Sequence, residues 1–118
     1  MTELVALLSR GEGTWAQVAG LIKQGDWENI ILIGDDFARN FKVESKVPIT
    51  FIELKSRRLV ELKQEIQEKL KGKINGTEVA LNIASGDGKE HMALISALLS
   101  IPVGVRFTAL TREGIIVL

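Results

Sequence analysis

The apolar positions of the chain form short runs that alternate with segments of helical periodicity. Mainly apolar runs, typical of β-strands, lie at 4–9, 29–34, 48–54, 78–83, 105–110 and 115–118. The run at 29–34 is almost wholly apolar, which predicts a strand covered on both faces of a parallel sheet. Pro48 stands at the first position of its run, where the missing N–H group costs least.

Helices are predicted between these runs. Thr14 is expected to cap a first helix with Val18 and Leu21 on its apolar face. Asp35 and Asp36 are expected to cap a short helical turn that ends near residue 41.

Two longer helices follow in the second half of the chain. Ser56 is expected to open the longest helix, which reaches about Gly72 and includes Leu59 in its apolar stripe. The segment 89–100 is apolar nearly all round, so we expect it to be buried, in part by a second subunit. Pro102 ends this helix.

Strands alternating with helices indicate right-handed crossovers and a mostly parallel sheet between two helical layers. The turn at Arg112, Glu113 and Gly114 joins the last two strands, so an antiparallel hairpin should close the sheet. The predicted fold class is α/β, a Rossmann-like three-layer sandwich with a C-terminal antiparallel hairpin. A length of 118 residues suits a single domain spanning 1–118.

Composition and charge exclude several classes of function. Fifteen basic and fifteen acidic side chains balance, so no overall field favours duplex nucleic acid. The sequence has no cysteine and one histidine, His91, which argues against metal sites and disulfides and fits a cytoplasmic protein. The apolar runs are far shorter than the roughly 20 residues that span a membrane. We therefore expect no membrane association.

Candidate chemistry lies where the predicted strands end, because open α/β sheets bind ligands beyond the carboxyl ends of their strands. The first such loop holds Ser9, Arg10, Gly11, Gly13 and Thr14. The second holds Asp35 and Asp36, which can cap a helix or hydrogen-bond a ribose. The third spans 85–89, where glycines, a helix N-terminus and a lysine favour an anionic ligand.

Two nucleotide-binding motifs can be compared with these loops. The third loop is not a P-loop, because Ile83 occupies the place of the first glycine and Glu90 follows the lysine. The segment 11–16 fits the glycine fingerprint of dinucleotide-binding folds, and Asp35 follows at about the expected spacing of roughly 20 residues. Glu12 places an acid within that loop. A dinucleotide- or mononucleotide-binding module is therefore the alternative prediction.

The third loop also resembles a known family. Residues 82–93 read Asn-Ile-Ala-Ser-Gly-Asp-Gly-Lys-Glu-His-Met-Ala. This is similar to the signature loop of CARF domains, the CRISPR-associated Rossmann-fold family, which typically reads Asn-x-Thr-Gly-Gly-Thr-Lys-x-Met. Counted from Lys89, Ser85 and Gly86 match the first hydroxyl and glycine, whereas Asp87 and Gly88 replace the second glycine and the threonine. Met92 lies one residue further along than in the family pattern.

The resemblance implies a stand-alone CARF homodimer that binds a cyclic oligoadenylate across its twofold axis. It would act as a sensor or sink in a CRISPR-type antiviral system, without a cofactor, and as a slow, metal-independent ring nuclease in some family members. Ser9 and Lys89 are carried over as the pair facing the ligand phosphates and as the catalytic candidates. The ligand-binding candidates are Arg10, Gly11, Gly13, Thr14, Asp35, Ser85, Gly86, Asp87, Gly88 and Met92. His91 is expected to be structural, and a third alternative is a structural dimeric subunit of a larger complex.

Overall fold

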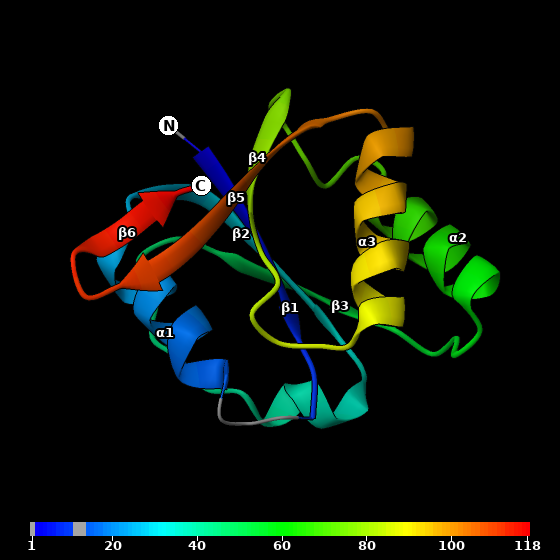
Figure 1. The fold of residues 1–118 in the computed structure, drawn as a ribbon, viewed down its shortest axis with the longest axis horizontal. Helices are drawn as coiled ribbons and strands as arrows, with labels where there is room; N and C mark the ends of the chain where they lie inside the picture. Colours follow the sequence, from blue (N-terminus) through cyan, green and yellow to red (C-terminus); the bar gives the residue numbers. More distant parts are fainter. Residues whose placement is uncertain (1, 11–13) are drawn as a thin grey trace.

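The computed structural model describes residues 2–10 and 14–118 and contains a six-stranded mixed sheet (Figure 1). The strands follow the order β3-β2-β1-β4-β5-β6 across the sheet. Their bounds are Thr2–Leu8 (β1), Trp27–Gly34 (β2), Ile49–Glu53 (β3), Glu78–Asn82 (β4), Gly104–Thr111 (β5) and Gly114–Val117 (β6). The first five strands are parallel, and β5 pairs with β6 in an antiparallel hairpin. This arrangement confirms the predicted Rossmann-like fold class.

Helices cover both faces of the sheet, which makes the three layers. Their bounds are Trp15–Gln24 (α1), Asp36–Asn40 (η2, a 3-10 helix), Leu59–Leu70 (α2) and Gly88–Ser100 (α3). Helices α2 and α3 lie side by side on one face, and α1 lies on the opposite face (Figure 1). Within the described part of the chain, no helix is long and apolar enough to cross a membrane.

Strand β1 lies at the centre of the sheet and contributes side chains to both halves of the core. Val5 and Leu7 pack with the apolar faces of α2 and α3, whereas Leu4 and Leu8 pack with α1. All four are fully buried. Because successive strand residues face opposite sides of the sheet, a strand covered on both faces must be apolar at every position. This explains the unbroken apolar runs in the sequence.

Helix α2 differs from the sequence prediction in its start and its length. It begins at Leu59 rather than Ser56, and its 12 residues make it shorter than the 13-residue α3. The backbone N–H of Ser56 donates to the Glu65 carboxylate at 2.8 Å, which holds residue 56 in the loop that precedes the helix. Leu59 is 38% exposed and lies outside the core stripe, which is formed by Leu62, Ile66 and Leu70.

Helix α3 is buried along one face only, and not all round. Ala93, Leu94 and Leu98 are completely buried against the sheet and α2. Met92 and Leu99, on another face of the helix, are 57% and 61% exposed. The helical period turns these two side chains away from the core although they are as apolar as those inside.

Candidate functional site

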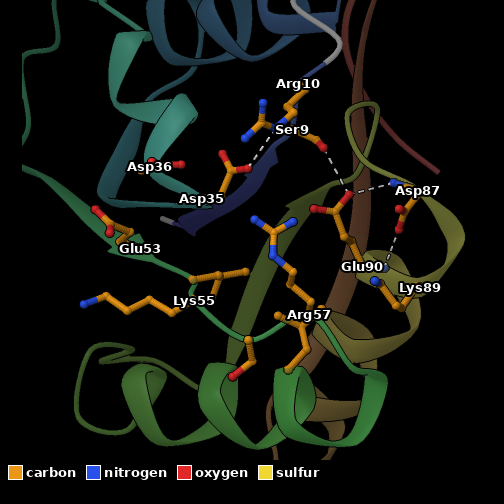
Figure 2. Close-up of a pocket in the computed structure, with 13 residues that line it drawn as sticks. Ser9, Arg10, Asp35, Asp36, Glu53, Lys55, Arg57, Asp87, Lys89 and Glu90 are labelled. Atoms are coloured by element: carbon orange, nitrogen blue, oxygen red, sulfur yellow. Dashed lines mark hydrogen bonds and ion pairs between the residues drawn. The ribbon is translucent and has the colours of Figure 1, made fainter.

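The sheet has a topological switch point between the neighbouring strands β1 and β4. Strands β2 and β3 lie on one side of β1, and β4, the next strand along the chain, lies on the other side of β1. Crevices at such points lie beyond the carboxyl ends of the strands. A cleft of about 470 Å³ lies there, bounded by the loops after β1, β2 and β3 and by the start of α3 (Figure 2).

A capping box closes the start of α3. The backbone N–H of Glu90 donates to Asp87 Oδ1 at 2.8 Å, and the backbone N–H of Asp87 donates to Glu90 Oε1 at 2.9 Å. Asp87 is therefore the N-cap of α3. Both N–H groups are therefore satisfied by carboxylates of the protein, which leaves these two donors unavailable to an anionic ligand.

The loop between β4 and α3 is locked against the end of β1. The buried hydroxyl oxygen of Ser85 accepts a hydrogen bond from the backbone N–H of Ser9 at 2.7 Å. His91 Nε2 lies 2.9 Å from the Ser85 carbonyl oxygen, which gives this histidine a structural contact. Gly86 has φ +101°, and a Cβ there would lie 2.4 Å from Leu7 Cδ2. The glycine is needed for its backbone conformation and for its close approach to β1.

Ser9 and Lys89, the two catalytic candidates, both line the cleft. The hydroxyl of Ser9 donates to Glu90 Oε1 at 3.1 Å, and its carbonyl oxygen accepts from Trp15 Nε1 at 2.7 Å. Figure 2 shows Ser9 and Glu90 joined by a hydrogen bond on the side of the cleft formed by the first turn of α3. The N-cap of α3 and the end of β1 are thus joined in one hydrogen-bond network.

Arg10 and Asp35 form an ion pair on the opposite side of the cleft. Arg10 Nε lies 3.3 Å from Asp35 Oδ2, and its guanidinium lies 5.4 Å from the centre of the Phe37 ring. Asp35 Oδ1 also accepts from the backbone N–H of Phe37 at 3.0 Å and so caps η2. The Trp15 ring packs against Phe37 and Phe41, which gives it a packing role.

The structure brings together about half of the candidate site residues. Ser9, Arg10, Asp35, Asp87 and Lys89 line the cleft. The described cleft wall does not include Ser85, Gly86, Gly88 or Met92, which support the loop or lie along α3. Thr14 occupies the N-cap position of α1. Gly11 and Gly13 lie outside the described residues.

Four charged residues that line the cleft were not candidates from the sequence: Glu53, Lys55, Arg57 and Glu90. Two signals could have found them. Glu90 stands three residues after Asp87, which is the spacing of a capping box. Lys55 and Arg57 follow β3 directly, and the rule applied to the other strand ends also covers this one.

The cleft contains both signs of charge, but their pairing is uneven. Acidic and basic side chains line it: Asp35, Asp36, Glu53, Asp87 and Glu90, with Arg10, Lys55, Arg57 and Lys89. Asp35 pairs with Arg10, and Glu53 pairs with Arg39, which lies outside the cleft. In the described part of the chain, Lys55, Arg57 and Lys89 form no ion pair with an acid. Figure 2 shows the Arg57 guanidinium directed into the cleft. These three cations are available to an anionic ligand.

The loop that carries Lys55 and Arg57 is held by Glu65 of α2. Its carboxylate accepts from the backbone N–H groups of Lys55 and Ser56 and from Lys69 Nζ, the last at 2.7 Å. Partial burial raises the pKa of the Glu65 carboxyl, but the Lys69 ammonium and the backbone donors outweigh it and lower this pKa to about 2. Glu65 therefore stays ionised and fixes one wall of the cleft.

The described residues contain no group of three or more histidine, cysteine, aspartate or glutamate side chains arranged to hold a metal ion. The polar side chains that line the cleft are lysine and arginine cations, the hydroxyls of Ser9 and Ser56, and carboxylates.

Comparison with protein-family models gives no match, and comparison with curated proteins gives none either. Among solved structures, the chain is similar to a short-chain dehydrogenase/reductase from Veillonella parvula, with 18% sequence identity and a TM-score of 0.48. The match covers 89% of this chain and 46% of the dehydrogenase chain. The present chain thus spans less than half the length of that protein.

Proposed function

We propose that the chain binds a phosphate-bearing nucleotide in the cleft at the switch point of its sheet. The observation that carries this proposal is the set of three cations, Lys55, Arg57 and Lys89, that lie in the cleft without an ion pair among the described residues. Hydrogen bonds from lysine and arginine to phosphate are charge-assisted and stronger than neutral ones, and no carboxylate of the described residues already engages these three cations.

The proposed ligand geometry follows from the two sides of the cleft. Lys89 in the first turn of α3 and Arg57 in the loop after β3 both line the cleft, so both can contact one phosphate-rich part of the ligand. Ser9 presents its hydroxyl oxygen beside them, because its proton is already donated to Glu90. The sugar and base would extend toward the Arg10 and Asp35 side of the cleft.

The finer proposal is that the nucleotide is a cyclic oligoadenylate, bound by a homodimer that acts as a sensor or sink in a CRISPR-type antiviral system. It rests on the resemblance of residues 82–93 to the CARF signature loop. Two copies of Lys89 and Arg57 around a twofold axis would suit a ligand that has its own twofold symmetry. In a cleaving dimer, the ligand's 2′-hydroxyl would attack the adjacent phosphorus and form a 2′,3′-cyclic phosphate. The P–O5′ bond would break, the 2′-hydroxyl proton would pass to water, and the leaving oxygen would take a proton from water to become a 5′-hydroxyl. Lys89 would stabilise the charge on the phosphate, and Ser9 would orient the attacking hydroxyl.

A second candidate is a dinucleotide such as NAD, and one observation favours it. Asp35 follows β2 next to the central strand, which is where dinucleotide-binding folds place the acid that binds a ribose. In this chain, however, the Asp35 carboxylate already accepts from Arg10 and from the Phe37 backbone. A ribose would have to replace one of these contacts.

Isothermal titration calorimetry with cyclic tetra-adenylate, cyclic hexa-adenylate and NAD separates the two candidates. The proposal predicts tight binding of one cyclic oligoadenylate and weak or no binding of NAD. Binding of NAD alone would establish the second candidate, and binding of none of the three would refute a nucleotide site. Chromatography of the bound ring after incubation with a chelator then tests for metal-independent cleavage, with Lys89→Ala as the comparison.

A further inference from the structure

A second basic surface lies along β3, away from α3. It is an open groove of about 650 Å³, which we call the β3-edge groove. Residues 50–53 of β3 form its floor, Arg39 of η2 lies on one side, and Lys69, Lys71 and Lys73 lie at the end of α2. Glu53 pairs with Arg39, and Lys69 pairs with Glu65. Of the other charged residues that line the groove, Lys55, Lys71 and Lys73 stand against Glu68, so the unpaired charge is mainly positive.

The floor of this groove is the open edge of the sheet. Strand β3 pairs with β2 on one side, and no strand in the described ranges lies on its other side. The N–H of Leu54 donates to the Gly34 carbonyl in β2 at 2.7 Å. Because the backbone groups of a strand alternate in direction, those of Phe51 and Glu53 point away from β2. Lys69 Nζ, 2.7 Å from the Glu53 carbonyl oxygen, lies on that open side.

An open strand edge presents both N–H donors and C=O acceptors, and this selects the kind of occupant. A peptide backbone can satisfy both groups, whereas the phosphates of a nucleic acid can only accept hydrogen bonds. A second copy of this edge would bring the same lysines against Lys69, Lys71 and Lys73, and like charges repel. The charge and the backbone pattern together favour an extended acidic peptide.

The two faces of β3 predict where the acidic side chains of that peptide lie. Ile52 belongs to the core half that packs on α2, while Phe51 belongs to the half that contains α1, with Arg39 stacked 4.8 Å from the centre of its ring. The lysines at the end of α2 therefore lie on the Ile52 side. An added strand would direct every second side chain toward them.

We propose that the free edge of β3 binds an extended acidic segment of a partner protein, which adds a strand to the sheet and directs alternate carboxylates toward Lys69, Lys71 and Lys73. The incoming backbone N–H replaces Lys69 at the Glu53 carbonyl, which frees the ammonium for a carboxylate of the partner. This surface is distinct from the nucleotide cleft, although Glu53 and Lys55 border both.

The test is fluorescence anisotropy with a labelled octapeptide of alternating threonine and glutamate, on the intact chain. Strand addition predicts binding that weakens with salt, and a loss of about tenfold or more for the double variant Lys71→Glu/Lys73→Glu. The matched control Lys23→Glu/Lys46→Glu makes the same change in charge at exposed lysines elsewhere and should bind as the unmodified protein does.

A peptide N-methylated at alternate backbone amides keeps its charge but loses strand pairing, and it should bind at least about tenfold more weakly. This comparison uses the unmodified protein, so it decides the question even where a variant does not fold. Equal binding of the methylated peptide, tighter binding of a single-stranded octa-adenylate RNA, or no peptide binding would each overturn the proposal.

Discussion

The carboxylate of Glu65 is expected to control the acid sensitivity of the wall that presents Lys55 and Arg57. It lies under the loop between β3 and α2 and is 12% exposed. Its partners are two successive backbone N–H groups and the Lys69 ammonium. Replacing Glu65 with glutamine keeps the size of the side chain but removes its charge and one acceptor oxygen.

The magnitude follows from the pKa of this group. Burial raises the pKa of Glu65, and the hydrogen bonds from Lys69 and the loop outweigh it, so the folded value is about 2 against an ordinary value of 4.5. At about 1.4 kcal/mol per pKa unit, this difference corresponds to about 3 kcal/mol of folding stability. Because the folded pKa is depressed, the stabilisation is complete well above pH 4.5 and is lost as the pH falls toward 2.

Urea denaturation of the unmodified protein and of Glu65→Gln between pH 7 and pH 2 measures this effect. We expect the variant to be about 2–3 kcal/mol less stable at pH 7, because glutamine can still accept one of the hydrogen bonds, and the difference to shrink below pH 4.5. Glu61→Gln, at an exposed position on the same helix, should change stability by less than about 0.5 kcal/mol. A Glu65→Gln difference that stays constant down to pH 2 would refute the reasoning.

Three further variants test the start of α3. Gly86→Ala should lose about 1–3 kcal/mol of stability in urea denaturation, because φ is +101° and the new Cβ would meet Leu7 Cδ2; a loss below about 0.5 kcal/mol would contradict this. Asp87→Ala should cost about 1 kcal/mol and Asp87→Asn much less, and equal losses would contradict the capping role. Glu90→Gln should raise the affinity for cyclic tetra-adenylate in calorimetry, because it removes a negative charge beside Lys89; a weaker affinity would contradict the placement of phosphates there.

Most of the fold could be predicted because the strand sequences are apolar at consecutive positions, which indicates strands buried on both faces. Residues 4–8 of β1 and 30–34 of β2 are unbroken apolar runs, and the helix periodicity of α1 identifies its buried side chains. The start of α2 could not be predicted, because Ser56 is a favourable capping residue whose N–H is taken by Glu65, nine positions away. Only the folded chain brings those two residues together.

The sequence indicated where the cleft lies, but not all of the residues that line it. Ser9, Asp35 and Lys89 were found because they follow strands or begin a helix, and the strand order brings these ends together. Local sequence does not reveal that the Ser85 hydroxyl turns inward to Ser9, since that contact joins residues 76 positions apart. Arg57 was missed because it lies in a segment that the pattern predicts as helix.

The most direct test of the nucleotide cleft is calorimetry of cyclic tetra-adenylate with the double variant Arg57→Ala/Lys89→Ala, beside Lys23→Ala/Lys46→Ala. Each removed cation should cost a charge-assisted contact, so we predict an affinity loss of about a hundredfold or more for the first variant and no change for the second. An unchanged affinity in Arg57→Ala/Lys89→Ala, or an equal loss in the two variants, would contradict the assignment of the cleft as the phosphate-binding site.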